Sequence, residues 1–169
     1  MTPTFAAAIY TPKQADKSAL PDFLQCLKDL KINVAGIVQE SHIKEGHRTR
    51  TIEAVDIITG QRTEIKRPMR SETECGLDAS NLVETSATLR AAILARPDLV
   101  IIDKFGDQEQ IGEGLLDEIL QIIAEEIPLL IAVPEPALSN WHKRTGEMGQ
   151  VIPFHKDDML NWWQSINQV

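Results

Sequence analysis

The sequence predicts a single three-layer α/β/α domain over residues 1–169, with a mainly parallel sheet and an appended β-hairpin. Two observations predict this class. Short apolar runs of strand length alternate with amphipathic helical patterns along most of the chain, as they do in β-α-β units. The length of 169 residues suits one domain with a buried core, and the apolar fraction of 43% and the charged fraction of 25% are ordinary for a globular protein.

A β-α-β unit opens the chain. Residues 4–10 form an apolar run that ends shortly before Pro12, which predicts a buried strand followed by a turn. A helix is expected next, with Ser18 as its N-cap and Pro21 in its first turn. Residues 34–38 predict a second buried strand, and a crossover of this kind gives parallel strands. The helix is marked by apolar side chains at helical spacing, namely Leu20, Phe23, Leu24, Leu27 and Leu30.

The middle of the chain predicts the hairpin and a second helix. Residues 42–49 are polar and predict a loop. Residues 51–57 and 62–65 alternate between apolar and polar side chains around Gly60, which predicts a β-hairpin. The helix is expected to extend from an N-cap at Asp78 to about Ala95, with Leu77 and Leu82 as a hydrophobic staple and with Leu82, Leu89 and Ile93 buried.

The second half alternates again between strands and helices. Residues 99–102 predict a buried strand that ends at Asp103, residues 128–133 another, and residues 151–154 a short last strand. Three helices are expected between and after them: one marked by Leu115, Leu116, Ile119, Leu120 and Ile123, a short one over residues 136–144, and a final one capped by Asp157 that carries Leu160, Trp163 and Ile166.

Composition excludes several classes of protein. A formal net charge of −8 argues against a protein that wraps nucleic acid by bulk electrostatics. The longest apolar stretch, residues 127–133, is far too short to insert across a membrane, and the N-terminal segment lacks the basic residues of a signal peptide. Cys26 and Cys75 form no CxxC pair, so we expect a cytoplasmic protein with reduced thiols.

The first candidate site is the segment between the first strand and the first helix. Ligands of parallel sheets bind beyond the carboxyl ends of the strands. Lys17-Ser18 stand at the spacing of the phosphate-binding loop G-x-x-x-x-G-K-[ST], where Lys contacts phosphates and Ser binds Mg²⁺, but Thr11 and Asp16 replace the two glycines. Lys17 and Ser18 are therefore candidate phosphate-binding residues. The alternative is a solvated loop whose serine caps the helix.

The second candidate site follows the strand that ends at Asp103. An aspartate at this position matches the Walker-B carboxylate that holds Mg²⁺, so Asp103 and Ser18 are the candidate metal ligands. Glu109 could polarise a water molecule and is the candidate catalytic residue. Phe105 and Gly106 are expected to contact the ligand. The alternative is a strand-end aspartate that caps a neighbouring loop.

The third candidate site is a group of basic residues around the hairpin. Arg48 and Arg50 are its candidate ligand-binding residues, because they could gather an anion onto an otherwise acidic protein. The alternative is ordinary solvated surface charge. The whole group comprises His42, Lys44, His47, Arg48, Arg50, Arg62, Lys66, Arg67 and Arg70.

Four segments resemble a bacterial domain-of-unknown-function family whose members are often encoded near molybdate-transport genes. They are VAGIVQE at 34–40, DIITGQ at 56–61, CGLD at 75–78 and KFGDQEQIGEG at 104–114. The family is similar to the small P-loop nucleoside-triphosphatases of the thermophilic-NTPase type, and the resemblance covers nearly the whole chain. It implies a P-loop-NTPase-like fold and gives residues 103–109 the Walker-B role. The intact P-loop of those enzymes is the feature that this chain lacks.

These observations predict a protein that binds a nucleotide or another phosphorylated small molecule through a degenerate P-loop, with Mg²⁺ as the expected cofactor. If the protein is an enzyme, the expected activity is that of a nucleoside-triphosphatase-like hydrolase, although the altered loop predicts little turnover. The alternative is a non-catalytic accessory or binding protein for molybdate or molybdenum-cofactor handling. A third alternative is a homo-oligomeric regulatory domain. The expected partner is a small anionic ligand rather than nucleic acid.

Overall fold

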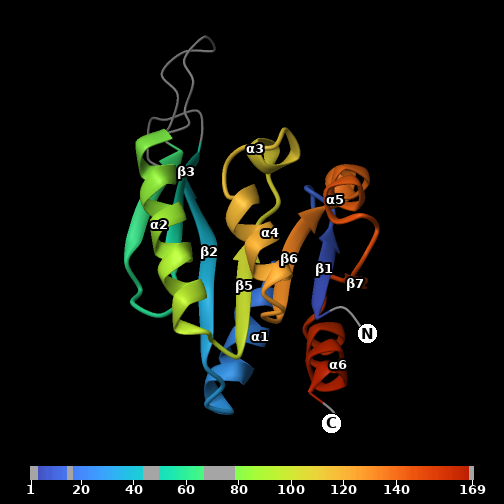
Figure 1. Ribbon diagram of the computed structural model, residues 1–169. Coiled ribbons are helices and arrows are strands. Elements are labelled where there is room, and N and C mark those ends of the chain that lie inside the picture. The colour runs from blue at the N-terminus through green and yellow to red at the C-terminus, as the bar shows by residue number, and fades with distance from the viewer. Residues whose placement is uncertain (1–3, 15–16, 44–49, 67–78, 168–169) are drawn as a thin grey trace.

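The computed structural model describes residues 4–14, 17–43, 50–66 and 79–167. In this part of the chain, seven strands form one sheet in the order β4-β3-β2-β5-β6-β1-β7, with helices packed against it (Figure 1). The strands are β1 (Phe5–Tyr10), β2 (Val34–Ile43), β3 (Arg50–Asp56), β4 (Arg62–Lys66), β5 (Leu99–Asp103), β6 (Leu129–Pro134) and β7 (Gln150–Pro153). The helices are α1 (Ala19–Asp29), α2 (Ala79–Ala95), α3 (Asp107–Gln110), α4 (Leu116–Ala124), the 3-10 helix η1 (Glu135–Ala137), α5 (Leu138–Thr145) and α6 (Lys156–Ile166).

Five of the strands are parallel. β2 pairs with β5, β5 with β6, β6 with β1 and β1 with β7, all in the same direction. The carboxyl ends of these strands therefore meet at one rim of the sheet, which is the upper edge in Figure 1. The predicted mainly parallel sheet is confirmed.

The hairpin β3–β4 is antiparallel and extends the sheet beyond β2. Its turn is held by the side chain of Asp56, whose Oδ1 accepts the N–H groups of Ile58 at 2.8 Å and Thr59 at 3.3 Å. The predicted hairpin is confirmed, but β2 is longer than the sequence predicted. It continues to Ile43, because its last residues pair with the first residues of β3. Of the loop predicted at 42–49, residues 44–49 lie outside the described part.

Each face of the sheet buries its own apolar cluster, which gives the domain three layers. Helices α1 and α6 cover one face, where they bury Phe23, Leu27 and Trp162. Helices α2, α4 and α5 cover the other face. Successive residues of β5 alternate between the two clusters, with Ile101 in the first and Ile102 in the second, as the two-residue period of a strand requires.

The sequence placed two helix features wrongly. The last helix begins at Lys156 with His155 as its N-cap, so Asp157 lies in the first turn instead of capping it. Leu30 is not part of the apolar stripe of α1, since it is the C-cap and is 63% exposed. The proposed staple of α2 involves Leu77, Asp78 and the side chain of Leu82, which lie outside the described part. No helix that the structure describes is both long and apolar enough to cross a bilayer.

Replacement of Gly36 tests how closely β2 and β5 must approach. Gly36 has a φ of +126°, and an added Cβ would lie 1.9 Å from the carbonyl oxygen of Ile101. We expect Gly36→Ala to lower the free energy of unfolding by about 3 kcal/mol or more, as strain and overlap combine. Gly60→Ala is the matched control, because Gly60 also has a positive φ (+75°) but has open space around its Cβ position. Urea denaturation of both variants would contradict this account if the two losses were equal.

Candidate functional site

A cleft with a volume of about 740 Å³ lies on the α1 face of the sheet. It opens between α1, the ends of β1 and β5, and the surface of β2 and β3. Its size is that of a small-molecule pocket. The residues that line it are Tyr10, Pro12, Gln14, Lys17, Leu20, Pro21, Leu24, Gln25, Lys28, Val38, Gln39, Glu40, Ser41, Ile52, Val55, Asp56, Ile57, Gly60, Asp103, Lys104 and Phe154.

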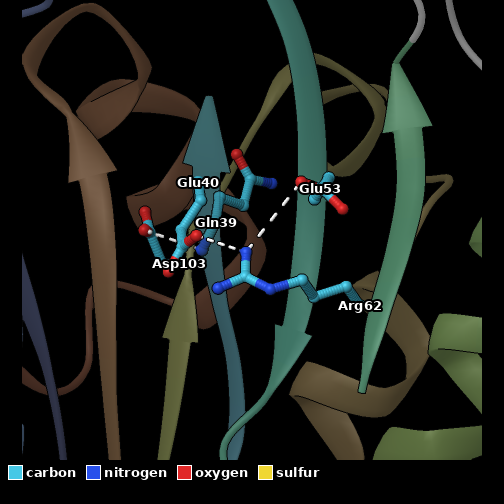
Figure 2. A network of polar contacts seen from close by, with 5 residues as sticks. All are labelled: Gln39, Glu40, Glu53, Arg62 and Asp103. Atoms are coloured by element: carbon cyan, nitrogen blue, oxygen red, sulfur yellow. Dashed lines mark hydrogen bonds and ion pairs between the residues drawn. The ribbon is translucent and has the colours of Figure 1, made fainter. Parts of the chain in front are cut away.

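Asp103 occupies the point where β5 ends beside β2. Its Oδ2 accepts the N–H of Gln39 at 3.1 Å, so the carboxylate takes up a backbone donor of the neighbouring strand (Figure 2). Burial raises the pKa of Asp103, while the Gln39 N–H and the charges of Lys104 and Lys17 act in the opposite direction. Burial also raises the pKa of Tyr10, and the charge of Asp103 adds to this effect. Tyr10 therefore remains a neutral hydroxyl at the cleft.

Lys17 and Asp103 both line this cleft. Lys17 is exposed, precedes α1 and is close enough to Asp103 for its charge to lower the pKa of that carboxyl. Ser18 is the N-cap of α1, but its side chain does not make a capping hydrogen bond, and it does not line the cleft. Of the predicted pair, only Lys17 therefore faces the cavity.

Phe105, Gly106 and Glu109 do not line the cleft, contrary to the prediction. The ring of Phe105 is fully buried and packs edge-on against Trp141, at 5.3 Å between centroids. Glu109 is 7% exposed, and its two oxygens accept the N–H groups of Gly106 at 2.8 Å and Leu115 at 3.0 Å. N–H groups that are shielded from water need such acceptors, because leaving them unpaired is costly. Through these two contacts, Glu109 stabilises the loop to which it belongs.

The same arrangement explains why glycines occupy two positions of this loop. Gly114 has a φ of +61°, and a Cβ there would lie 1.8 Å from Oε2 of Glu109. Gly112 also has a positive φ and lies against the guanidinium of Arg144, which donates to the carbonyl of Gln110 at 3.1 Å. Residues 104–114, the acidic-glycine segment, are therefore a folded connection between β5 and α4 that also contacts α5.

Of the basic group, Arg62 is the member whose side chain lies in the described part of the chain. Its guanidinium donates to the carboxylate of Glu40 on β2 and lies 3.9 Å from Oε1 of Glu53 on β3 (Figure 2). Glu40 and Glu53 are directly opposite each other in the β2–β3 ladder, where like charges repel. Arg62 thus offsets the charge of Glu40 beside the cleft and weakens the repulsion between Glu40 and Glu53. Arg48 and the side chain of Arg50 lie outside the described part.

A metal ion in this cleft would need oxygen atoms from a bound ligand in addition to the protein's own carboxylate. No cluster of three or more His, Cys, Asp or Glu side chains that could hold a metal occurs within the described ranges. Mg²⁺ is commonly held by one or two carboxylates together with phosphate oxygens and water. Asp103 fits that donor set as a single carboxylate, provided that phosphate supplies further oxygens.

The sequence did not predict the part of the cleft that lies away from the rim. Lys28 of α1 and Val55 and Ile57 of the hairpin line it. The signal was present in α1, because Leu24 and Lys28 follow Lys17 at helical spacing along one side of the helix. Nothing in the alternation of the hairpin shows which of its half-buried residues faces a cavity.

Comparisons with known proteins support the family and the fold. Residues 5–162 match the family model described as "Protein of unknown function (DUF2478)". The chain is 36% identical over 164 residues to the "Molybdenum import ATP-binding protein ModC 2" of Bradyrhizobium diazoefficiens, a match that covers 96% of this chain and 18% of that protein. The chain thus spans less than a fifth of that curated relative's length.

Among solved structures, THEP1 from the hyperthermophile Aquifex aeolicus is similar with a TM-score of 0.64, at 13% identity and with 96% of both chains covered. Such low identity shows the fold alone. The predicted P-loop-NTPase-like α/β fold is thereby confirmed.

Glu109 can be tested by removing its carboxylate. Glu109→Ala leaves the N–H groups of Gly106 and Leu115 without their acceptor, and we expect a loss of about 2–4 kcal/mol in the free energy of unfolding. Glu113→Ala, in the same loop but exposed, should change it by less than about 0.5 kcal/mol. Equal stability of the two variants in urea denaturation would show that Glu109 does not hold the loop.

The ionised side chain of Asp103 should lower the free energy of unfolding at neutral pH. Its pKa is raised by burial, so the folded protein binds this proton more tightly than the unfolded chain does. The destabilisation is present above the folded pKa and disappears as the pH falls below the ordinary pKa of an aspartate. Asp103→Asn, which keeps an oxygen for the Gln39 N–H, should therefore raise the free energy of unfolding at pH 7 but not at about pH 3. Urea denaturation across this range would contradict the account if the variant were less stable at pH 7.

Proposed function

The chain belongs to the family described as "Protein of unknown function (DUF2478)", and from that premise we propose that it binds a phosphorylated small molecule, such as a nucleotide, in the cleft beside α1. The observation that carries this proposal is the convergence of Lys17, Lys104 and Asp103 at the rim of the parallel sheet. This rim is where α/β sheets bind their ligands.

The rim can attract an anion in two ways. Lys17 and Lys104 place two ammonium groups at the cleft. The N-terminus of α1 follows Lys17 directly, and a helix N-terminus offers a partial positive charge and unpaired N–H groups. Asp103 would then hold Mg²⁺ together with the phosphate oxygens, which supplies charge neutralisation when the metal is bound.

The loop between β1 and α1 favours ligand binding without rapid hydrolysis. A phosphoryl-transfer enzyme needs several backbone donors around the transferred group. In this chain Thr11 and Asp16 stand where the P-loop glycines would be, and the carbonyl of Thr11 closes a turn by accepting the N–H of Gln14 at 2.9 Å. Glu109, the candidate for polarising water, is occupied by its own loop.

A second candidate function has its own support. The match to ModC 2 extends over almost all of this chain. Molybdate is a tetrahedral oxyanion like phosphate, so the same cations suit it. The alternative is therefore that the domain is a non-catalytic accessory to molybdate or molybdenum-cofactor handling, acting in the cytoplasm.

A thermal-shift and calorimetry screen with ADP, GDP, pyrophosphate and molybdate, with and without Mg²⁺, tests the proposal. A ligand present at about 100 times its dissociation constant should stabilise the protein by about 2.7 kcal/mol. Lys17→Ala should weaken binding of the successful ligand at least about tenfold, through loss of a charge-assisted hydrogen bond. Lys13→Ala is the control, because Lys13 is exposed in the same loop but does not line the cleft. Absence of any shift, or equal effects of both variants, would contradict the proposal.

The same preparation tests for hydrolysis. We expect phosphate release from ATP and GTP to remain far below the rates of typical enzymes, about 1–1000 per second. Brisk Mg²⁺-dependent turnover that Lys17→Ala abolishes would show that the altered loop is still catalytic.

A further inference from the structure

The cleft is longer than a phosphate site requires. It follows α1 from Lys17, which precedes the helix, through Leu20 and Leu24 to Lys28. At the rise of an α-helix, the stretch of α1 from Leu20 to Lys28 alone spans about 12 Å. A phosphate at the rim would fill only one end of this length.

The floor of the lower cleft is an apolar patch on the sheet. Val38 of β2 and Val55 of β3 are directly paired in the antiparallel ladder, so their side chains lie on the same face. Val38 and Ile57 also pack against the cluster that contains Leu24 of α1. Val38, Val55 and Ile57 are only partly buried, in contrast to the fully buried side chains of β5. They form an apolar slot that is open to solvent.

Charge is distributed unevenly along the cleft. The cations Lys17 and Lys104 are at the rim, whereas the carboxylate of Glu40 is neutralised by Arg62 and that of Asp56 accepts N–H groups of its own turn. The side chains of the slot itself, between Leu24 and Val55, are apolar, and the carboxylates beside it are engaged by Arg62 or by backbone N–H groups. Lys28 stands at the far end as a hydrogen-bond donor.

We infer that this slot is the binding site for the flat, uncharged ring of a nucleobase, over the Val38–Val55 pair and against Leu24, with the phosphates at the rim. The inference rests on the proposed function for the phosphate end. A ring in the slot would cover apolar surface that inorganic phosphate leaves exposed to water, and each such contact favours binding. The appended hairpin then has a role in specificity, because Val55 and Ile57 belong to it.

Isothermal titration with pyrophosphate, ADP and GDP tests the slot separately from the rim. We expect at least one nucleotide to bind about tenfold tighter than pyrophosphate or more, because only the nucleotide uses the apolar contacts. Val55→Trp should fill the slot, lower nucleotide affinity at least about tenfold and leave pyrophosphate affinity unchanged. Ile58→Trp is the control, since Ile58 is 58% exposed in the same hairpin and does not line the cleft; it should change neither affinity.

The outcomes separate the two claims. If pyrophosphate binds as tightly as both nucleotides, or if Val55→Trp lowers all affinities equally or none, the ring slot is wrong although the phosphate site stands. If neither pyrophosphate nor nucleotide binds, the proposed function fails and the slot fails with it. Should Val55→Trp not fold by circular dichroism, the isosteric Val55→Thr replaces it, with a selective loss of nucleotide affinity still expected. A self-associating wild-type protein that Val55→Trp makes monomeric would assign the slot to a second copy of the chain instead.

Discussion

The parallel ladder between β2 and β5 runs from Val34 and Leu99 to Ile37 and Ile102, and β5 ends one residue later, at Asp103, while β2 continues. Two residues after Ile37, the N–H of Gln39 donates to the carboxylate of Asp103 instead of a strand carbonyl. This side-chain contact ends the parallel sheet on that side and leaves the upper part of β2 to pair with the hairpin alone. The cleft lies beside this change of partner, with Asp103 and Lys104 at its rim and Val38 and Val55 on its floor.

The position of Asp103 makes its ionised form unfavourable for folding and also places it at the rim where a ligand would bind. A carboxylate held at a strand end, with burial raising its pKa, is unfavourable for the fold when ionised. Its neighbours at the rim, Lys17 and Lys104, offset part of this cost and at the same time make the rim attractive to anions. Arg62 of β4 offsets the charge of Glu40 in a similar way and lies 3.9 Å from Glu53. Two lysines of the cleft, Lys17 and Lys104, are therefore at the rim, next to a slot lined by apolar side chains.

Much of the fold could be predicted from the sequence because buried parallel strands are continuous apolar runs, as in residues 99–102 and 129–133. The extension of β2 could not, since the polar residues of QESH give no burial pattern and the strand depends on pairing with β3. The acidic-glycine segment shows a different limit. An acid flanked by glycines looks the same in sequence whether it binds a ligand or its own backbone, and only the contacts of Glu109 decide between these. Lys17 and Asp103 could be placed at one rim from the sequence because strand ends converge by topology, whereas Val55 lines the cleft through a pairing that no local pattern reveals.

The central claim is that the ligand site is the cleft between α1 and β2–β3 and not the acidic-glycine segment, residues 104–114. The most direct test is a titration of the isotope-labelled protein with ADP, followed by amide chemical shifts in NMR spectra. The account predicts the largest shifts at Lys17, Gln39 and Lys104 around the rim and at Val55 in the slot, with little change at Gly106, Glu109 and Gly112. Shifts concentrated in that segment, or no saturable shifts at all, would contradict it.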